Sequence, residues 1–556
     1  MPSTSAPRRI AMRAAAIASL VAAAVGSTAS ADEPSAGELA VHLRTSSPES
    51  WLTAADRLIA EHPQADDLRA KLNMGRLVLG IYGVDAAKPV AATAFYPEAE
   101  AMRRNEMAAP SRFLIRAGTL RLRRFERFGV QPNSPGQLYV DLDAKRIAPL
   151  PETMPAYAAS DGETVLLTDA RETATAARLA EIGPPERSLL LAESTAEIEV
   201  GLSMRAVSPA FRDRIRREIA EGFKTAARRQ FDRPGPSAIE RRLSLESLRL
   251  LQSAAAAWAD LDSALIAAGL DDASRMAFTG RLAWADDDVL ATLGEMAPLE
   301  ERVDAVADDR VLVRSDLHLT VSQRTAVRLS RLIELIGQQV RDEARRNETL
   351  PYLAPSIDQI EDELLETLRA RRLVASLAVL AEGERAGVLF AMRTKQPDRI
   401  DAAIRGFLTR VRSAPAAETE ANGVRWLRFP SDEEAADGDE RPQPFWLGHD
   451  RDTLWMLVGT LPPSAAVARV SRSAAPNGPD RVASWFDAAL RLDRIAAGRQ
   501  ALRSIAIDVP SVPLLEQAGA DDVVRFEIGP TADGSQATLR LPATLVRHAA
   551  AQIEAD

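Results

Sequence analysis

The sequence predicts an α+β protein made of several modules, each an antiparallel sheet with helices packed on one face. Strands that alternate apolar and polar residues are joined by short loops rich in Asp and Gly, and helical patterns follow the hairpins. Strands joined by tight hairpins are antiparallel, and their apolar face needs a covering layer. Similar elements also recur in the same order, which predicts an internal duplication of about residues 194–300 and 313–411.

The first 31 residues have the pattern of a cleavable export signal. Arg8, Arg9 and Arg13 precede an apolar run, and small residues end the segment at Ala31. The run is too short for a stable membrane span. We therefore expect cleavage near Ala31/Asp32, a secreted protein in the periplasm or outside the cell, and no transmembrane segment in the mature chain.

Residues 32–186 are predicted to form an N-terminal α+β module. It begins with a strand in "LAVHLRT" and helices in "SPESWLTAADRLIAEH" and "DDLRAKLNMGRLVLGIYG", followed by a strand in "PVAATAFY" and a hairpin in "AYAASDGETVLLT". Residues 111–128 interleave arginines with phenylalanines. They are interpreted as a strand and a helix whose Arg stems cover apolar surface, with an anionic polymer site as the alternative.

Residues 187–310 and 311–415 are predicted to be two repeat modules. Each begins with an alternating strand, "EIEVGLSM" or "DLHLTV", and continues into a long helix, the first with Pro209 in its first turn. A second helix should begin at a capping box, Ser237 with Glu240 in one copy and Ser356 with Gln359 in the other. A hairpin and another helix complete each copy.

Residues 416–556 are predicted to form a C-terminal α+β module. Its hairpins lie in "FWLGHDRDTLWMLVG" and "VVRFEIGPTADGSQATLRL", and Pro463 and Pro542 should open the helices that follow. The charged segment from Ser431 to Pro444 is expected to be a mobile loop.

In this order of elements the chain resembles a group of exported bacterial proteins of similar length. The resemblance includes "GVDAAKPVAATAFYP" at residues 83–97 and the two strand-helix copies, and it spans most of the mature chain. It implies export and duplicated strand, hairpin and helix modules, and it implies no activity.

Composition excludes several classes of function. The formal net charge is −10, and loss of the three signal arginines makes it −13, which opposes binding to nucleic acid or anionic lipid. The sequence contains no cysteine, which excludes disulfides, thiolate nucleophiles, Cys-based zinc sites and a lipid-bearing Cys.

The histidines do not form a metal-binding pattern. His42, His62, His318, His449 and His548 are scattered, without an HxH or HExxH spacing. His42 and His318 fall on the polar sides of strands and are expected at the surface, whereas His449-Asp450 should form a hairpin turn. We expect no metal and no cofactor.

No catalytic motif is found elsewhere. "GLSMR" at residues 201–205 lacks the second Gly of a nucleophile elbow, and there is no P-loop. The acidic run Asp286 to Asp288 is predicted to cap a helix, and the acidic segment 431–440 to be a solvated loop, although carboxylates can also bind calcium. Catalytic residues remain unknown.

The sequence leaves three functions open. The first is an exported non-enzymatic protein that acts by protein–protein contact, with an envelope protein or a second copy, or as a structural element of the envelope. The second is a periplasmic carrier of a hydrophobic ligand, suggested by the strands at residues 373–381 and 387–392, which are apolar on both faces. The third is a hydrolase with a carboxylate-based site.

Overall fold

A computed structural model describes most of residues 38–59, 85–97, 112–118, 130–142, 154–168, 197–231, 238–346, 354–412, 417–429, 444–467, 484–509 and 513–553. The chain divides into two compact units. The first unit contains Met1–Ile215, Asp260–Ala285 and Arg540–Asp556, and the second contains Arg216–Ala259 and Asp286–Leu539. Among the described residues the fold is a mixture of helix and strand in which antiparallel sheet dominates.

The sheet of the first unit is antiparallel throughout the described pairs. Its strands follow the order β4-β5-β6-β7-β3-β2-β1-β8-β9-β10. The strand bounds are β1 Glu38–Thr45, β2 Val90–Pro97, β3 Arg112–Gly118, β4 Val130–Ser134, β5 Gln137–Leu142, β6 Met154–Ser160, β7 Thr164–Thr168, β8 Ile198–Ser203, β9 Leu261–Leu270 and β10 Met276–Trp284.

The second unit has the same strand order with each strand number raised by ten. Its strands follow the order β14-β15-β16-β17-β13-β12-β11-β18-β19-β20. The strand bounds are β11 Val311–Thr320, β12 Arg372–Glu382, β13 Arg385–Arg393, β14 Ala417–Ala421, β15 Val424–Phe429, β16 Phe445–His449, β17 Thr453–Gly459, β18 Phe486–Arg491, β19 Val523–Thr531 and β20 Gly534–Leu541, of which residues 534–539 belong to this unit.

Two helices of the first unit come from opposite ends of the described chain. Helix α2 (Pro48–Ile59) follows β1, and α16 (Ala543–Ile553) lies beside it. Helix α6 (Pro209–Phe231) begins with the expected proline, and its first turns pack on the sheet through Phe211 and Ile215. No helix among the described residues has the length and apolar character needed to cross a membrane.

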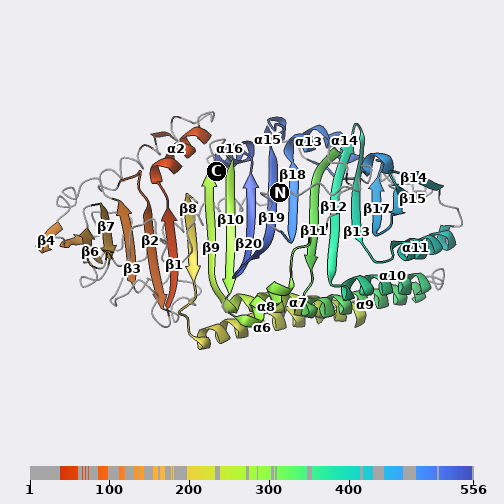
Figure 1. The fold of residues 1–556 in the computed structure, drawn as a ribbon, viewed down its shortest axis with the longest axis horizontal. Coiled ribbons are helices and arrows are strands. Elements are labelled where there is room, and N and C mark those ends of the chain that lie inside the picture. The colour runs from red at the N-terminus through yellow and green to blue at the C-terminus, as the bar shows by residue number, and fades with distance from the viewer. Residues whose placement is uncertain are drawn as a thin grey trace. The chain divides into compact units, whose positions relative to one another are not determined.

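The long helices of the second unit lie side by side. Helix α9 lies beside α7 and α10, and α10 beside α11. In Figure 1, α9 and α10 run across the ends of β11, β12 and β13. The helix bounds are α7 Ala238–Ala256, α8 Asp287–Glu295, α9 Gln323–Arg346, α10 Ala354–Arg369, α11 Pro397–Arg412, α12 Pro463–Ala466, α13 Leu492–Ala497, α14 Arg499–Arg503 and α15 Pro513–Glu516, with a 3-10 turn at Ala257–Asp260.

Each sheet has two chemically different faces. We call the side that bears His42 on β1 or His318 on β11 the histidine face, and the opposite side the leucine face. Side chains alternate along a strand, so on β12 Val374 lies on the histidine face and Leu373 on the leucine face. The largest core cluster covers the histidine face of the second unit and contains Trp426 and Trp455.

Helices contribute to both faces of the second unit. On the histidine face, Ala465 and Ala466 of α12 join the cluster that contains Val374. On the leucine face, side chains of α8 and α9 pack against Leu317 and Leu373. The expected packing of helices on one face is therefore not confirmed for this unit, although α12 begins at Pro463 as the sequence predicts.

Most predicted elements are present, with one correction at a helix start. The hairpins β6–β7, β9–β10, β12–β13, β16–β17 and β19–β20 lie where their turn residues place them. Helix α10, however, begins at Ala354, so Ser356 is a buried residue inside the helix and not its N-cap. Proline at the second helical position supplies the start signal instead.

Several predictions concern segments outside the described residues. These are the signal at residues 1–31, the capping residue Ser237, most of the helix expected in residues 66–83, the part of the basic stretch after Gly118, and the acidic loop at residues 431–443. The five module bounds also stay a prediction.

Gly459, the last residue of β17, lies where the backbones of β13 and β17 approach closely. Its φ is 129°, and a Cβ atom there would lie 2.4 Å from the Ala386 carbonyl oxygen. We expect Gly459→Ala to lower the free energy of unfolding by at least about 2 kcal/mol, through backbone strain and overpacking. Urea unfolding followed by tryptophan fluorescence would measure it. Gly406→Ala, in helix α11 with nothing within 4 Å, should instead raise stability by up to about 1 kcal/mol. Equal midpoints for both variants would contradict the packing.

Candidate functional site

The central strand of each unit carries a buried histidine. The exposed fraction is 0% for His42 on β1 and 1% for His318 on β11. The prediction that both lie at the surface is wrong. Alternation identifies the side of a strand that bears polar residues, but it does not say whether that side is covered by other parts of the chain.

In the first unit, His42 belongs to a buried polar cluster on the histidine face. Its Nδ1 lies 2.9 Å from the Thr93 hydroxyl on the neighbouring strand, directly opposite in the register. Arg44, two residues further along β1, stands opposite Glu199 on β8, and their charged groups are 3.6 Å apart. Arg116 on β3 is also buried.

The electrostatics of this cluster keep His42 neutral. Burial, followed by the charges of Arg116 and Arg44, lowers the pKa of His42 to about 3. A neutral imidazole can accept or donate a hydrogen bond without the desolvation cost of a third buried cation. The arrangement therefore supports a structural role for His42.

In the second unit, His318 lies between a serine and a carboxylate. Its Nε2 is 3.3 Å from the Ser484 hydroxyl and 3.8 Å from Oδ2 of Asp487. Asp487 on β18 stands directly opposite Asp316 on β11, and Arg314 forms a 2.7 Å ion pair with Asp316. Two adjacent carboxylates are thus held beside one histidine and one arginine.

This cluster differs from a nucleophilic triad. In a triad the histidine uses one ring nitrogen for the serine and the other for the carboxylate. Here both contacts involve Nε2 of His318. Among the residues that the structure describes, no group of three or more His, Cys, Asp and Glu side chains is arranged to hold a metal ion.

Other residues singled out in the sequence have structural positions. Asp286 caps α8, because its carboxylate accepts a 3.0 Å hydrogen bond from the Val289 amide. Asp450 forms the expected hairpin turn and accepts from the amides of Asp452 and Thr453. Ser203 of "GLSMR" is buried at the end of β8. His548 lies on α16, and His62 is outside the described residues.

The leucine face of the second unit carries two apolar rows that cross the strands. In each row, neighbouring residues are direct register partners on adjacent strands, from β19 through β18, β11, β12, β13 and β17 to β16. The valine row contains Val524, Leu490, Val313, Val379, Val388, Val458 and Phe445. The leucine row contains Phe526, Ala488, Ser315, Leu377, Phe390, Met456 and Leu447.

Each row has one side chain that is widely open to solvent. The exposed fraction is 45% for Leu377 and 41% for Val458, although both lie on inner strands of the sheet. Exposed leucine or valine residues at isolated positions are common, but a continuous apolar surface of this kind marks an interaction site in soluble proteins. Neither row could be seen in the sequence, because its members come from distant segments.

Helices cover the neighbouring part of the same face. Leu317 and Leu373 pack with Leu329 of α9, and Leu454 packs with Ile400 of α11. The same cluster contains Leu447, which is fully buried, and Phe445 and Met456 pack against it, so α11 covers the β16 end of both rows. The leucine face thus has parts covered by amphipathic helices and, between them, the open part of the two rows, which reaches from β19 to Val458 on β17.

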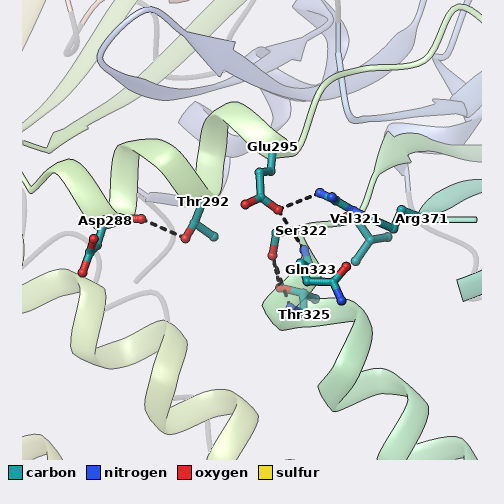
Figure 2. Close-up of polar contacts among 8 residues, drawn as sticks. All are labelled: Asp288, Thr292, Glu295, Val321, Ser322, Gln323, Thr325 and Arg371. Carbon is teal, nitrogen blue, oxygen red and sulfur yellow. Dashed lines mark hydrogen bonds and ion pairs between the residues drawn. The ribbon is translucent and has the colours of Figure 1, made fainter. Parts of the chain in front are cut away.

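A polar junction fixes α8 and α9 at the covered part (Figure 2). Oε2 of Glu295, at the end of α8, accepts hydrogen bonds from the Gln323 amide at 2.9 Å and from Nη2 of Arg371 at 2.6 Å. Nε of Arg371 donates to the Val321 carbonyl at 2.8 Å. Ser322 caps α9 through the Thr325 amide, 3.2 Å away. The junction ties α8 to the starts of α9 and β12.

The first unit has a comparable row on its leucine face. Ile266 on β9 has an exposed fraction of 60%, and α6 covers the adjacent Leu202 and Ala264. The row follows register partners from β10 to β7 and contains Gly280, Ile266, Val200, Leu43, Ala92, Ile115 and Leu167.

Comparison of the chain with models of protein families, with curated proteins and with solved structures finds no match. The chemistry of its own surfaces and clusters is therefore the basis for a function.

The low pKa of His42 predicts a specific pH dependence of stability. An unfolded histidine titrates near 6.5, whereas folded His42 titrates at about 3, so only the unfolded chain gains this proton between those values. The contribution of neutral His42 to the free energy of unfolding is fully present above pH 6.5, and it is lost progressively as the pH is lowered toward 3. We expect this residue to remove about 2 kcal/mol of unfolding free energy between pH 7 and pH 5. Urea titrations of wild type and His42→Gln would test this, and an unchanged pH dependence in the variant would contradict it.

The junction predicts a cost for removing the cap of α9. Ser322→Ala should lower the free energy of unfolding by about 1 kcal/mol, because the Thr325 amide loses its acceptor. Thr292→Ala, which removes a hydroxyl that donates to the Asp288 carbonyl within α8, should change it by less than about 0.5 kcal/mol. Thermal unfolding of both variants measures the difference, and equal losses would argue against a special role for the cap.

Proposed function

We propose that this chain is an exported, non-enzymatic protein that acts by protein–protein contact through the leucine face of its second unit. The observation that carries this proposal is the pair of apolar rows, with Leu377 and Val458 open to solvent on inner strands. A partner that covers them removes apolar surface from water, at about 25 cal/mol per Å².

The signal at residues 1–31 supports export, and the periplasm or the cell exterior is the proposed location. An apolar contact surface suits a protein that binds a neighbour in the envelope. A role as a structural element of the envelope is compatible with the same surface.

We further propose that the two units arose by duplication. Their strand orders agree when the numbers are raised by ten, and each has a buried histidine on its central strand. The shorter duplication expected for residues 194–300 and 313–411 is supported by a shared order of strand, two helices, hairpin and helix. This shorter duplication would then be nested inside the duplication of the two units.

A carrier of a hydrophobic ligand is the second candidate. It is favoured by the same rows, since strands β12 and β13 are apolar on both faces and only the histidine face is covered by the main core. A hydrolase is the third candidate, for which Asp316 and Asp487 are the carboxylates brought together.

Charges placed in the rows test the proposal. We expect the exported full chain, purified gently from its host, to show a protein complex in native mass spectra. Leu377→Asp combined with Val458→Asp should reduce the complex at least tenfold, because an unpaired carboxylate would have to be buried in the contact.

Leu251→Asp is the matched control, since Leu251 is an exposed leucine on helix α7 and is not part of either row. It should leave the complex intact. A bare monomer from the wild-type chain would overturn the proposal. Extra mass of a small molecule, lost on denaturation, would make the carrier the better function.

A further inference from the structure

We infer that the partner segment is an amphipathic helix that lies along the valine row and the leucine row, parallel to α9. This inference rests on the proposed function. It follows from the dimensions of the rows, from the helices already bound to the same face, and from the chemistry of the side chains in the rows.

The dimensions fit one helix. The part of the rows that α11 leaves uncovered crosses six strands, β19 to β17, which spans about 24 Å at a strand spacing of about 4.8 Å. A helix of about 16 residues has this length. The two rows are two residues apart along each strand, about 7 Å, so with their side chains they match the 10–12 Å diameter of a helix.

The rows continue an interface that the protein already uses. Leu329 of α9 packs on Leu317 and Leu373 of the leucine face, and Ile400 of α11 packs on Leu454 of the same face. Figure 1 shows α9 running along the ends of β11, β12 and β13 from one strand to the next, and the register partners of the rows also follow one another from strand to strand. A further helix beside it would extend a layer of helices over the sheet.

The chemistry selects an apolar, uncharged contact. Ser315 is the one polar residue in the rows, and no charged residue occurs in them. The helix should therefore present Leu, Ile, Val or Phe at spacings of three and four residues and turn polar residues outward. An extended strand is disfavoured, because the rows cross strands whose backbone groups are already paired.

Site-specific photocrosslinking in the exporting host tests the inference. A benzoylphenylalanine would replace Val524, Val379 or Val458 in the full chain, and each adduct would be mapped by mass spectrometry. Val524 and Val379 are three strand spacings apart, and Val379 and Val458 are two. We expect the three crosslinks on one partner segment, in that order, about 10 and about 6 residues apart.

Two further variants control for specificity. A probe at Leu251 on α7 should give no adduct on the same segment. Adding Leu377→Asp should reduce the Val458 adduct at least tenfold. A probe variant that fails to fold would not present the rows. The folding of each variant is therefore checked first by its tryptophan fluorescence, because Trp426 and Trp455 are buried only in the folded sheet.

The outcomes separate the inference from the proposed function. Protein adducts without the ordered spacing would overturn the helix and leave protein contact intact. Adducts to lipid or to a small molecule, or no adduct at any site, would overturn both. Adducts to the sheet of a second copy would replace the helix by self-association.

Discussion

The register of the central strand in each unit determines the chemistry of both faces. Side chains alternate along a strand, so a shift of β11 by one residue would bring His318 to the leucine face and Leu317 to the core. The polar clusters resist such a shift, because a misplaced carboxylate or arginine would lose its partner in a buried site. Burial of these groups therefore favours a single pairing, and the two apolar rows exist because that pairing is kept.

Local sequence patterns predicted individual elements well. Alternating residues and turn signals located the hairpins, and proline located the start of α6. Helix α10 begins three residues before the start that the capping box predicts, because Pro355 in its first turn favours a helix start there. In the same way, Asp286 was found as a cap since its amide partner is three residues away.

The sequence did not predict the two rows of the candidate site. Val524 and Val388 belong to one row although they are far apart in the chain, and only the order of the strands brings them into line. Glu295 and Arg371 meet for the same reason. The covering of His42 also depends on distant segments, so its polar side was correctly identified and its burial was not.

The central strands pair with strands that are far away in the chain, and this affects the order in which the sheet forms. Hairpins such as β12–β13 close over a few residues, whereas Thr45 must find Ile198 and Val313 must find Leu490. Long-range closure is slow, so the last step in each unit should be the docking of β1 on β8 or of β11 on β18. Until then the central strand is an open edge, and unpaired edges of this kind are the places where a folding chain is most prone to aggregate.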